Sequence, residues 1–505
     1  MPGRVIRFGF ADNGYNDLAT RRGVDWCEDF ATNAHMLVAG KSGTGKTFTL
    51  RRIVNQVIAP IAGKEPVRVH VFDVHGDMRF DQESRVLFSE STFYGINPFR
   101  LSADPHFGGV RKCVQSFIEM MGDSGPRAAL GPRQTTALRN VLYELFESKG
   151  FHVNDPGTWS IDAELDEEPD GQGRIYLEVP YDERDAAKAA ARAASANLKF
   201  DPDRRLWWCD QYAGGLERWP IHTRGRKAPT VPEAARFLSQ RLKTLVTGGG
   251  TRTVQLLEEH NKKVQVWQNK ARKLIDGAPK DDLEALQAEV HDGAAALIET
   301  FTDYVTSIGT GRELDALARY ESTDTLKSLA DRLDTMVATG IFRPRQPPFD
   351  PHAPVHTYDI APLRVAEQQF FVWTKVKQIL EDLMAQGPVA GASEVRTMIV
   401  LDESEKFFKD KEDNIIDRAV KEGRKFGLSI VAASQAPSHF SEDFLGNVGT
   451  KLLLGLDPMY RDVTARKMRI DPTILDYVVA SKIAAVSVSD KRDMAHGFVK
   501  TRVGN

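Results

Sequence analysis

The sequence predicts an α/β fold in which helices wrap a mostly parallel central sheet and a large, mainly helical insertion interrupts that core. Near the N-terminus, the apolar run Met36–Ala39 is followed by a glycine-rich loop and an amphipathic helix. More than 300 residues later, a second apolar strand, Thr397–Leu401, ends in two carboxylates. Strands and helices in this order predict an open sheet that binds its ligands at the carboxyl ends of its strands.

Composition excludes several classes of protein. Of the 505 residues, 41% are hydrophobic and 27% are charged, which is typical of folded domains and not of disordered or collagen-like chains. The net charge of −3 argues against a broadly basic protein, so any nucleic-acid surface must be local. Three widely spaced cysteines, Cys27, Cys113 and Cys209, fit neither a disulfide framework nor a zinc site and suit a reducing compartment.

The sequence shows no membrane or export segment. No apolar run approaches the ~18 residues needed to span a bilayer. The first residues lack the continuous apolar stretch of a secretory signal. We therefore expect a cytoplasmic protein, which another component must recruit if it works at the inner face of a membrane.

The most specific pattern is the loop after the first strand. It fits G-x-x-x-x-G-K-[ST], with the required strand before it and helix after it. Backbone N–H groups of such a loop cradle phosphates, and the helix N-terminus adds a favourable dipole. We expect ATP and Mg²⁺ here, with Lys46 neutralising the β- and γ-phosphates and Thr47 binding the metal. The predicted nucleotide-binding residues are Gly40, Lys41, Ser42, Gly43, Thr44, Gly45, Lys46, Thr47 and Phe48.

Acidic residues end two further strands. Asp73 ends the strand that begins at Val67, where it either faces the nucleotide from the carboxyl edge or simply closes a turn. Asp402 and Glu403 end the later strand. Because the same chain carries a phosphate loop, we expect Asp402 to orient the Mg²⁺ shell and Glu403 to polarise the attacking water.

Two more candidate site residues flank the next strand, which begins at Leu428. Gln435 follows its last residues and is placed to sense the γ-phosphate or to position water. Arg424 precedes the strand, at the end of a helix. Two roles are open for Arg424: a cation that stabilises the helix C-terminus, or a contact with the nucleotide of a neighbouring subunit. Arg461 and Arg466, on a later helix, are rivals for the second role.

Several motifs together resemble the HerA/FtsK superfamily of P-loop motor ATPases and, within it, the VirB-class ATPases of type IV secretion and conjugation. They are the loop Gly40–Thr47, Asp73–Asp77, Gly95–Pro98, the pair Asp402–Glu403 and the stretch from Arg424 to Gln435. The resemblance covers residues 30–160 and 320–500. It implies a RecA-like P-loop NTPase core, ATP hydrolysis and a ring, usually a hexamer, with ATP sites between subunits.

Changes in pattern divide the chain into segments. They are a first part of the ATPase core (1–100), a helical region (101–170), a small α+β module (171–222), a helical insertion with a long hairpin (223–345) and a second part of the core (346–505). Amphipathic helices are predicted at Val110–Met121 and Thr135–Phe146, and an acidic run, Asp162–Asp170, marks a boundary.

The small module is predicted to be βαβ-like, with strands at Arg174–Pro180 and Arg204–Cys209 and a helix at Glu183–Ala196. Residues 173–220 resemble a small accessory domain of conjugative-plasmid primases. Trp207 with Arg205 would suit stacking on an unpaired base. Most of the aromatic residues are nonetheless expected to fill the module's core, and these are Tyr176, Tyr181, Trp207, Trp208 and Trp219.

From Thr253 onward, apolar residues at three- and four-residue steps predict two antiparallel helices of ~22 residues each, separated by Gly277–Pro279. The first helix is basic, with Lys262, Lys263, Lys270, Arg272 and Lys273. These charges either form a solvated face with i,i+4 pairs or belong to an arm that touches nucleic acid or a partner protein.

Three functions are consistent with these observations. The first is a ring motor that moves DNA for a mobile element or a conjugation or secretion system. The second is a cytosolic energiser of a type IV secretion or pilus apparatus. The third is an ATP-controlled partner of a nuclease in phage defence, because the sequence shows no nuclease carboxylate cluster of its own. The expected partners are copies of the chain itself, DNA, and a secretion-system or nuclease protein.

Overall fold

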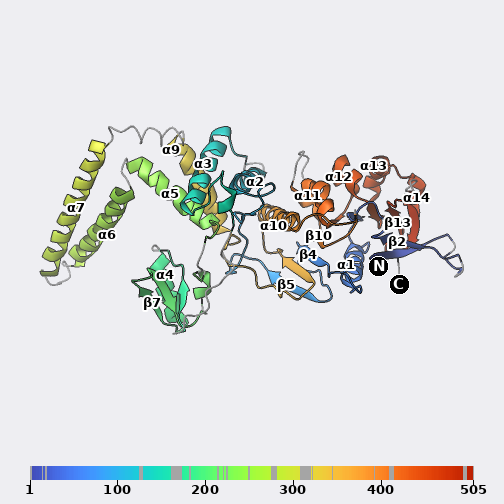
Figure 1. Ribbon diagram of the computed structural model, residues 1–505, viewed down its shortest axis with the longest axis horizontal. Coiled ribbons are helices and arrows are strands. Elements are labelled where there is room, and N and C mark those ends of the chain that lie inside the picture. The colour runs from blue at the N-terminus through green and yellow to red at the C-terminus, as the bar shows by residue number, and fades with distance from the viewer. Residues whose placement is uncertain are drawn as a thin grey trace.

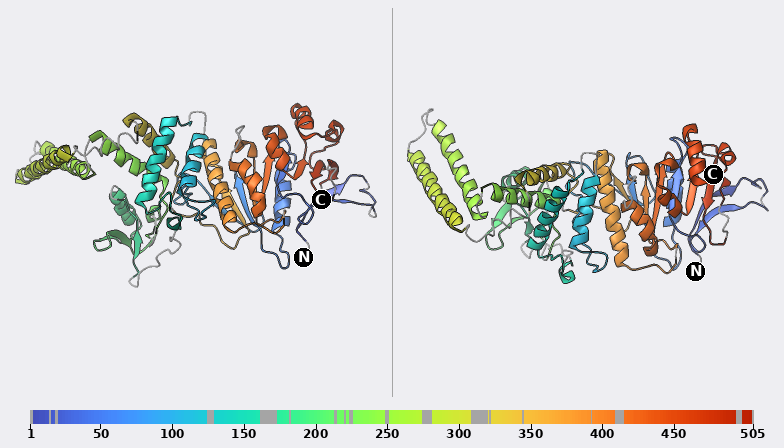
Figure 2. Two further views of the ribbon diagram at one scale, coloured as in Figure 1. Left: turned by 45° about the horizontal axis from the view of Figure 1, so that its top comes forward. Right: turned by 90° about the horizontal axis from the view of Figure 1, so that it is seen from above.

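The computed structural model describes residues 3–13, 15–17, 20–123, 129–160, 173–180, 183–212, 215–219, 221–222, 226–247, 251–273, 281–307, 320, 322–343, 345–391, 393–408, 415–492 and 497–503. The molecule is elongated, with a sheet and both chain termini at one end and a helical hairpin at the other (Figures 1 and 2). A small sheet-containing module lies to one side between them.

The described residues form an 11-stranded sheet with the order β2-β1-β14-β13-β12-β3-β11-β10-β4-β9-β5. Its strands are β1 (Val5–Ala11), β2 (Gly23–Cys27), β3 (Met36–Ala39), β4 (Arg68–Asp73), β5 (Glu83–Leu87), β9 (Val355–Asp359), β10 (Thr397–Leu401), β11 (Leu428–Ser434), β12 (Thr450–Leu453), β13 (Ile483–Val488) and β14 (Val499–Arg502). From β12 to β5 all neighbours are parallel. From β12 to β2 they are antiparallel. The prediction of a mostly parallel sheet is confirmed.

Side chains of the central strands alternate between two hydrophobic layers. Met36 and Val38 pack with α1 (Lys46–Ile58) on one face. Leu37 and Ala39 point to the other face, where α10 (Val365–Ala385), α11 (Ile415–Gly423) and α12 (Glu442–Asn447) contribute to the core. Because both faces are covered, these strands are continuous apolar runs, as buried parallel strands usually are.

Three elements, β5, β9 and α10, were not predicted from the sequence. Only one of the five β5 residues is buried, and β9 contains His356 and Thr357, so neither shows a clear apolar pattern. β9 nevertheless lies between β4 and β5 and pairs with both. A strand from the second half of the chain is therefore inserted between two strands from the first half.

Several helices of the insertion pack in the same hydrophobic core as one face of the central sheet. The predicted helices near Val110 and Thr135 are confirmed as α2 (Val110–Asp123) and α3 (Pro132–Ser148). They pack with α5 (Val231–Thr247) and α9 (Thr323–Ala338) in the same hydrophobic cluster as α10. The predicted acidic run at 162–170 lies outside the described residues.

The predicted helical pair is confirmed as α6 (Thr251–Lys273) and α7 (Asp281–Ser307), which pack along each other and form the far end of the molecule (Figure 1). The separator Gly277–Pro279 lies outside the described residues. None of the described helices is both long enough and apolar enough to cross a membrane.

The small module has its own sheet and core. It consists of β6 (Ile175–Leu177), α4 (Arg184–Ala193), β7 (Leu198–Asp201) and β8 (Leu206–Cys209), with the antiparallel strand order β6-β8-β7. The βαβ-like prediction missed β7, a short strand with two exposed residues at its centre. Tyr176 and Trp219 are buried as expected, whereas Trp207 and Trp208 are half-buried. Tyr181 lies outside the described residues.

Candidate functional site

The phosphate loop leaves the centre of the sheet at its carboxyl edge. It follows β3, which is fully buried between β11 and β12. Gly43 and Gly45 have φ values of 77° and 95°, a region that favours glycine. A Cβ atom at Gly40 would lie 2.5 Å from the Thr44 hydroxyl oxygen. The glycines therefore let the backbone fold tightly, and a loop of this kind turns its N–H groups toward a phosphate.

Lys46 begins α1 and reaches back over the loop. Its Nζ donates to the carbonyl oxygens of Gly40 at 2.8 Å and Lys41 at 3.3 Å. The Thr44 hydroxyl donates to the same Lys41 carbonyl at 2.7 Å. Thr47 is half-buried in the first turn of α1, whereas Lys41, Ser42, Gly43 and Phe48 are exposed. The predicted binding residues thus form one loop and the first turn of α1. The Lys46 amine contacts the carbonyl oxygens of this loop.

Asp402 follows β10, which β11 separates from β3. It is only 7% exposed, and its Oδ1 accepts the backbone N–H of Glu403 at 2.9 Å. Burial raises the pKa of Asp402, and the charge of Glu403 adds to the rise, while Lys46 and His75 oppose it. A nearby cation stabilises the ionised form of a buried carboxyl group. The burial and the chemistry of Asp402 are therefore compatible with a Mg²⁺ ion bound beside it.

Glu403 is held between a histidine and a lysine side chain. Its Oε1 lies 2.6 Å from Nε2 of His75, and its Oε2 pairs with Lys406 in the short 3-10 turn Ser404–Lys406. Burial alone raises the pKa of Glu403, but the hydrogen bonds and charges of Lys406 and His75 outweigh it and lower the pKa below its usual value. The carboxylate is therefore ionised at neutral pH, and both of its oxygens have partners.

Asp73 lies deeper than the nucleotide-facing position expected from the sequence. It is 0% exposed, and its carboxylate accepts hydrogen bonds from the turn that follows β4. The donors are the backbone N–H groups of His75 (3.2 Å), Gly76 (2.8 Å) and Met78 (3.0 Å) and the guanidinium of Arg85 (3.1 Å). The geometry thus gives Asp73 the second role considered for it, closing a turn, and this turn places His75 against Glu403.

Gln435 lies beside the start of the phosphate loop. The preceding residue, Ser434, pairs with Ala39 in the parallel ladder, and its carbonyl accepts the N–H of Gly40 at 3.0 Å. Gln435 itself is exposed at this edge. Lys46, Asp402, Glu403 and Gln435 are therefore all brought to the carboxyl edge of one sheet.

Arg424 lies at the opposite edge. It begins the short turn Arg424–Phe426 between α11 and β11, and Gly427 then redirects the chain with a φ of 83°. Seven residues of β11 separate this turn from Gln435, a span of ~23 Å at the usual rise of a strand. Arg424 is thus remote from the phosphate loop of its own chain.

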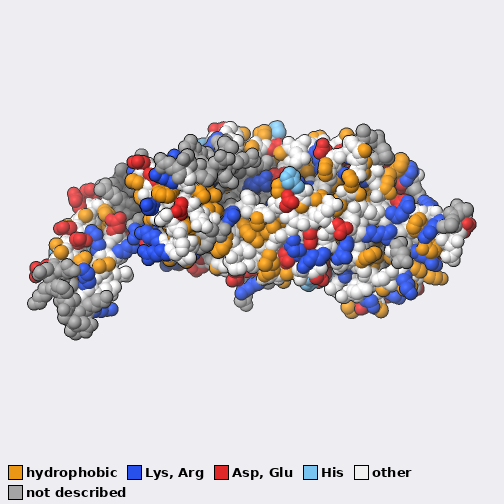
Figure 3. Space-filling model, turned by 90° about the horizontal axis from the view of Figure 1, so that it is seen from below, with side chains coloured by type: hydrophobic (Ala, Val, Ile, Leu, Met, Phe, Trp, Pro, Cys, Tyr) orange, Lys and Arg blue, Asp and Glu red, His pale blue; other side chains and the backbone are white. Residues whose placement is uncertain are grey.

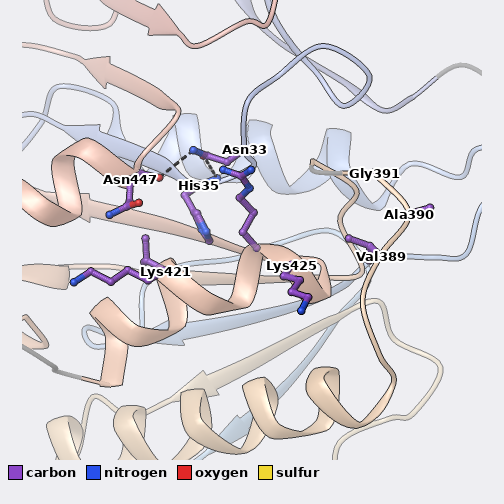
Figure 4. Close-up of a pocket in the computed structure, with 10 residues that line it drawn as sticks. Asn33, His35, Val389, Ala390, Gly391, Lys421, Lys425 and Asn447 are labelled. Carbon is purple, nitrogen blue, oxygen red and sulfur yellow. Dashed lines mark hydrogen bonds between the residues drawn. The ribbon is translucent and has the colours of Figure 1, made fainter.

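A hollow of about 460 Å³ opens beside Arg424 at this amino edge (Figure 4). Its lining residues are Asn33, His35, Val389, Ala390, Gly391, Val420, Lys421, Arg424, Lys425 and Asn447. Lys421, Arg424 and Lys425 are exposed, and Lys421 also pairs with Asp443 at 3.1 Å. Three cations around one concave surface suit a negatively charged group.

His35 adds no charge to this hollow at neutral pH. It is 1% exposed, and its Nδ1 accepts the backbone N–H of Ile430 at 3.0 Å. Burial is the main cause that lowers the pKa of His35 to about 4. The Val420 backbone opposes this shift, and the charge of Arg424 contributes to it. The positive character of the amino edge therefore comes from the lysines and the arginine.

Two segments of this chain match known protein families. Residues 19–107, which hold the phosphate loop and β4, match the family model described as the central domain of the helicase HerA. This chain is similar to HerA-type ATPases. Residues 174–220, which hold the small module, match a domain of unknown function, DUF5710. No curated protein matches the sequence.

Solved structures extend the likeness beyond the HerA-like segment. VirB4 of Thermoanaerobacter pseudethanolicus matches with a TM-score of 0.52 at 12% identity, over 98% of this chain and 96% of that chain. The bacterial conjugative coupling protein TrwBΔN70 matches with a TM-score of 0.45 at 13% identity, over 100% and 95%. The match to VirB4 shows that the two chains share a fold. The HerA family model confirms the expected resemblance to HerA-type ATPases over residues 19–107.

Several contacts of the HerA-like core were not predicted from sequence. Lys406 was not singled out, because its importance depends on the turn that brings it to Glu403. The rival arginines have local partners: Arg461 pairs with Asp476 at 3.3 Å, and Arg466 donates to the Asp462 carbonyl of its own helix, α13 (Pro458–Met468), at 3.5 Å. Of the three arginines considered for contact with the nucleotide of a neighbouring subunit, Arg424 is the one that lines the cationic hollow.

Proposed function

We propose that this protein is an ATP-hydrolysing motor of the HerA/FtsK/VirB class that assembles as a ring, most simply a hexamer, and moves DNA. One observation carries the proposal. The phosphate loop, Asp402 and Glu403 lie at the carboxyl edge of the sheet, while Arg424 lies at the amino edge. An ATPase site that needs both sets of residues can be completed only by a second subunit.

Within one subunit, the loop and Lys46 would bind the phosphates of ATP. Thr47 and Asp402 would hold Mg²⁺, which supplies charge neutralisation when it is bound. Glu403 would accept a proton from the attacking water. Because both of its oxygens are paired, with His75 and Lys406, at least one of these pairs must open before the carboxylate can do so.

The neighbouring subunit would supply Arg424. Its guanidinium would stabilise the negative charge that develops as the γ-phosphate is transferred, and Gln435 of the first subunit would position the water or sense the phosphate. Lys421 and Lys425 add positive charge beside Arg424 and so favour the approach of a phosphate-bearing edge. Specific activity is therefore expected to rise with protein concentration.

A mixing experiment tests the division of the site between subunits. Lys46→Ala and Arg424→Ala proteins should each be almost inactive alone, and their mixture should recover activity, because one supplies an intact loop and the other an intact arginine. Arginine fingers contribute roughly 10³-fold or more to the rate, so the recovery should be easily measured. A mixture of Lys46→Ala with Glu403→Gln, which both damage the same edge, is the matched control.

Two results would overturn this reading. If mixed rings form and no activity returns, Arg424 does not act on a neighbour. If the wild-type protein remains a monomer at micromolar concentration with ATP and Mg²⁺ but hydrolyses ATP at full rate, the ring proposal fails.

DNA as the moved polymer rests on the resemblance to HerA-type and conjugation ATPases. The VirB4 fold also favours a second candidate, a cytosolic energiser of a secretion or pilus apparatus, while control of a partner nuclease is a third. ATPase activity that single- or double-stranded DNA stimulates severalfold supports the DNA motor. Activity that ignores DNA and responds to a partner protein supports one of the others.

A further inference from the structure

The small module carries an aromatic and basic sheet face that the ATPase chemistry does not use. α4 covers one face of the sheet, where its alanines pack with Leu177 and Cys209. On the other face, Tyr176, Trp208 and Lys199 form one row across β6, β8 and β7, because each is paired directly with the next. Trp208 is half-buried and Lys199 is exposed.

Three cations contact the aromatic rings of this row. The Arg174 guanidinium lies 4.9 Å from the centre of the Trp208 ring, and the Lys199 amine lies 5.8 Å from it. The Arg204 guanidinium lies 4.4 Å from the centre of the Tyr176 ring. In the view from below, Lys and Arg side chains gather beside hydrophobic ones on this part of the molecule (Figure 3).

Three acidic residues near this face, Asp201, Asp210 and Glu178, already have partners. Asp201 accepts hydrogen bonds from the Tyr176 hydroxyl at 3.0 Å and from backbone N–H groups of its own turn. Asp210 accepts two from Asn197, and Glu178 pairs with Lys227 at 2.8 Å. The face therefore presents cations and a tryptophan ring, and these three carboxylates are engaged elsewhere.

A ligand suited to this face has flat rings to stack and negative charges to pair. Single-stranded nucleic acid has both, since its bases are unstacked and its phosphates follow at regular intervals. Three strands span roughly 10 Å, which accommodates about two or three nucleotides. A duplex hides the faces of its bases and cannot stack on Trp208 in this way.

We propose that the face formed by Arg174, Lys199, Arg204 and Trp208, with the buried Tyr176 beneath Arg204, binds single-stranded nucleic acid. Bases stack on Trp208, and the cations pair with phosphates. The site goes beyond the motor function and does not depend on it, because binding here requires neither ATP nor a ring. It gives the chain a means of holding an unpaired strand away from the phosphate loop.

The first test measures binding of fluorescein-labelled dT20 to the full-length protein by fluorescence anisotropy. Lys199→Glu and Trp208→Ala are each expected to weaken binding about 10-fold or more, and Trp208→Tyr should have a smaller effect because it keeps a stacking ring. Lys188→Glu is the matched control. It makes the same charge change on α4, on the other face, and should leave the affinity within about twofold.

The second test locates the contact. A dT20 containing 5-iodouracil should cross-link under ultraviolet light to a peptide that contains Trp208 or Tyr176. Cross-links that map only to the ATPase core would overturn the proposal. So would unchanged affinity in Lys199→Glu and Trp208→Ala, or equally effective competition by duplex DNA or polyglutamate.

These outcomes are separable from those of the motor proposal. If the mixing experiment fails but the cross-link maps to Trp208, only the divided ATPase site is wrong. If the ATPase behaves as proposed but the variants bind dT20 normally, only this inference is wrong. Thermal melting of each variant shows whether Trp208→Ala unfolds the module, and in that case the affinity of Lys199→Glu decides.

Discussion

The two edges of the central sheet hold their charges in different ways. At the carboxyl edge, charged groups are paired within the chain: Lys46 with loop carbonyls, Glu403 with His75 and Lys406, and Asp73 with Arg85. At the amino edge, Lys421, Arg424 and Lys425 line an open hollow with the neutral His35 beneath them, and of these three cations Lys421 pairs with Asp443. One edge is self-contained, and the other presents positive charge outward.

Under the ring proposal, this difference would keep a lone subunit inactive. Both carboxylate oxygens of Glu403, the proposed base, are already paired with His75 and Lys406, and these pairs would open only when ATP and a neighbouring subunit bind. At the amino edge, Arg424 and Lys425 are adjacent like charges that repel each other, and a negatively charged neighbour would relieve that repulsion. In the proposed ring, each subunit would therefore supply what the facing edge of its neighbour lacks.

The largest effect is expected from the carboxyl edge. Glu403→Gln should lower kcat by ~10²- to 10⁴-fold, because the water loses its base, while ATP binding persists. Lys46→Ala should instead weaken binding itself. Binding of a fluorescent ATP analogue and steady-state hydrolysis separate the two. Near-normal turnover in both variants would remove the assignment of this edge.

The amino edge should be sensitive to acid through His35. In the unfolded chain its pKa is about 6.5, and in the folded protein burial lowers the pKa to about 4. The unfolded state therefore takes up the proton first as pH falls from about 6.5 to 4, and stability decreases through this window by up to roughly 3 kcal/mol. Urea unfolding of wild type and His35→Gln at pH 7 and 4.5 checks this. The variant should lose less stability than the wild type on acidification, and exposed His106→Ala should behave as wild type.

A smaller effect is expected from the ion pair at Glu403. His75→Ala frees one carboxylate oxygen and removes a group that lowers the pKa of Glu403, so basal ATP hydrolysis should rise. Since His75 is half-exposed, solvent screening limits the gain to about 3- to 10-fold. Initial rates at saturating ATP measure it. A marked decrease would mean that His75 positions Glu403 for catalysis instead of restraining it.

The smallest effect is expected from the module. Deleting residues 171–222 should leave basal hydrolysis within about twofold, because the module has its own core and lies away from both edges of the large sheet (Figure 1). The same deletion should abolish the dT20 cross-link. Loss of the folded ATPase core would show that the module is integral to it and would contradict the boundary.

The residues that sequence analysis placed at the carboxyl edge share one property: each is fixed by a local pattern. Gly40 to Thr47 form a motif, and Asp402 and Glu403 end an apolar strand. The contact between Glu403 and His75 could not be predicted in this way. It depends on β10 pairing in parallel with β4, so that two turns distant in the sequence meet at one edge.

The parts that sequence analysis missed have weak patterns or distributed origins. β9 is short and mixes buried and half-buried residues without a regular alternation, so neither the strand nor its place between β4 and β5 can be recognised from the sequence. The hollow beside Arg424 is assembled from residues before β3, after α10, on α11 and before β12. No spacing along the chain links these segments.

Strands from distant parts of the chain are neighbours in the central sheet, and this order affects how the chain folds while the ribosome synthesises it. β3 pairs only with β11 and β12, β4 only with β9 and β10, and β5 only with β9, as far as the described residues show. β3 and β11 lie almost 400 residues apart, a distance that translation covers in roughly 20–80 s at ~5–20 residues per second. During that time the apolar strand that precedes the phosphate loop has no partner, whereas the small module and the α6–α7 hairpin need only neighbouring residues to fold. The nascent chain should therefore depend on a chaperone until its last third emerges, and the nucleotide site should be among the last parts to form.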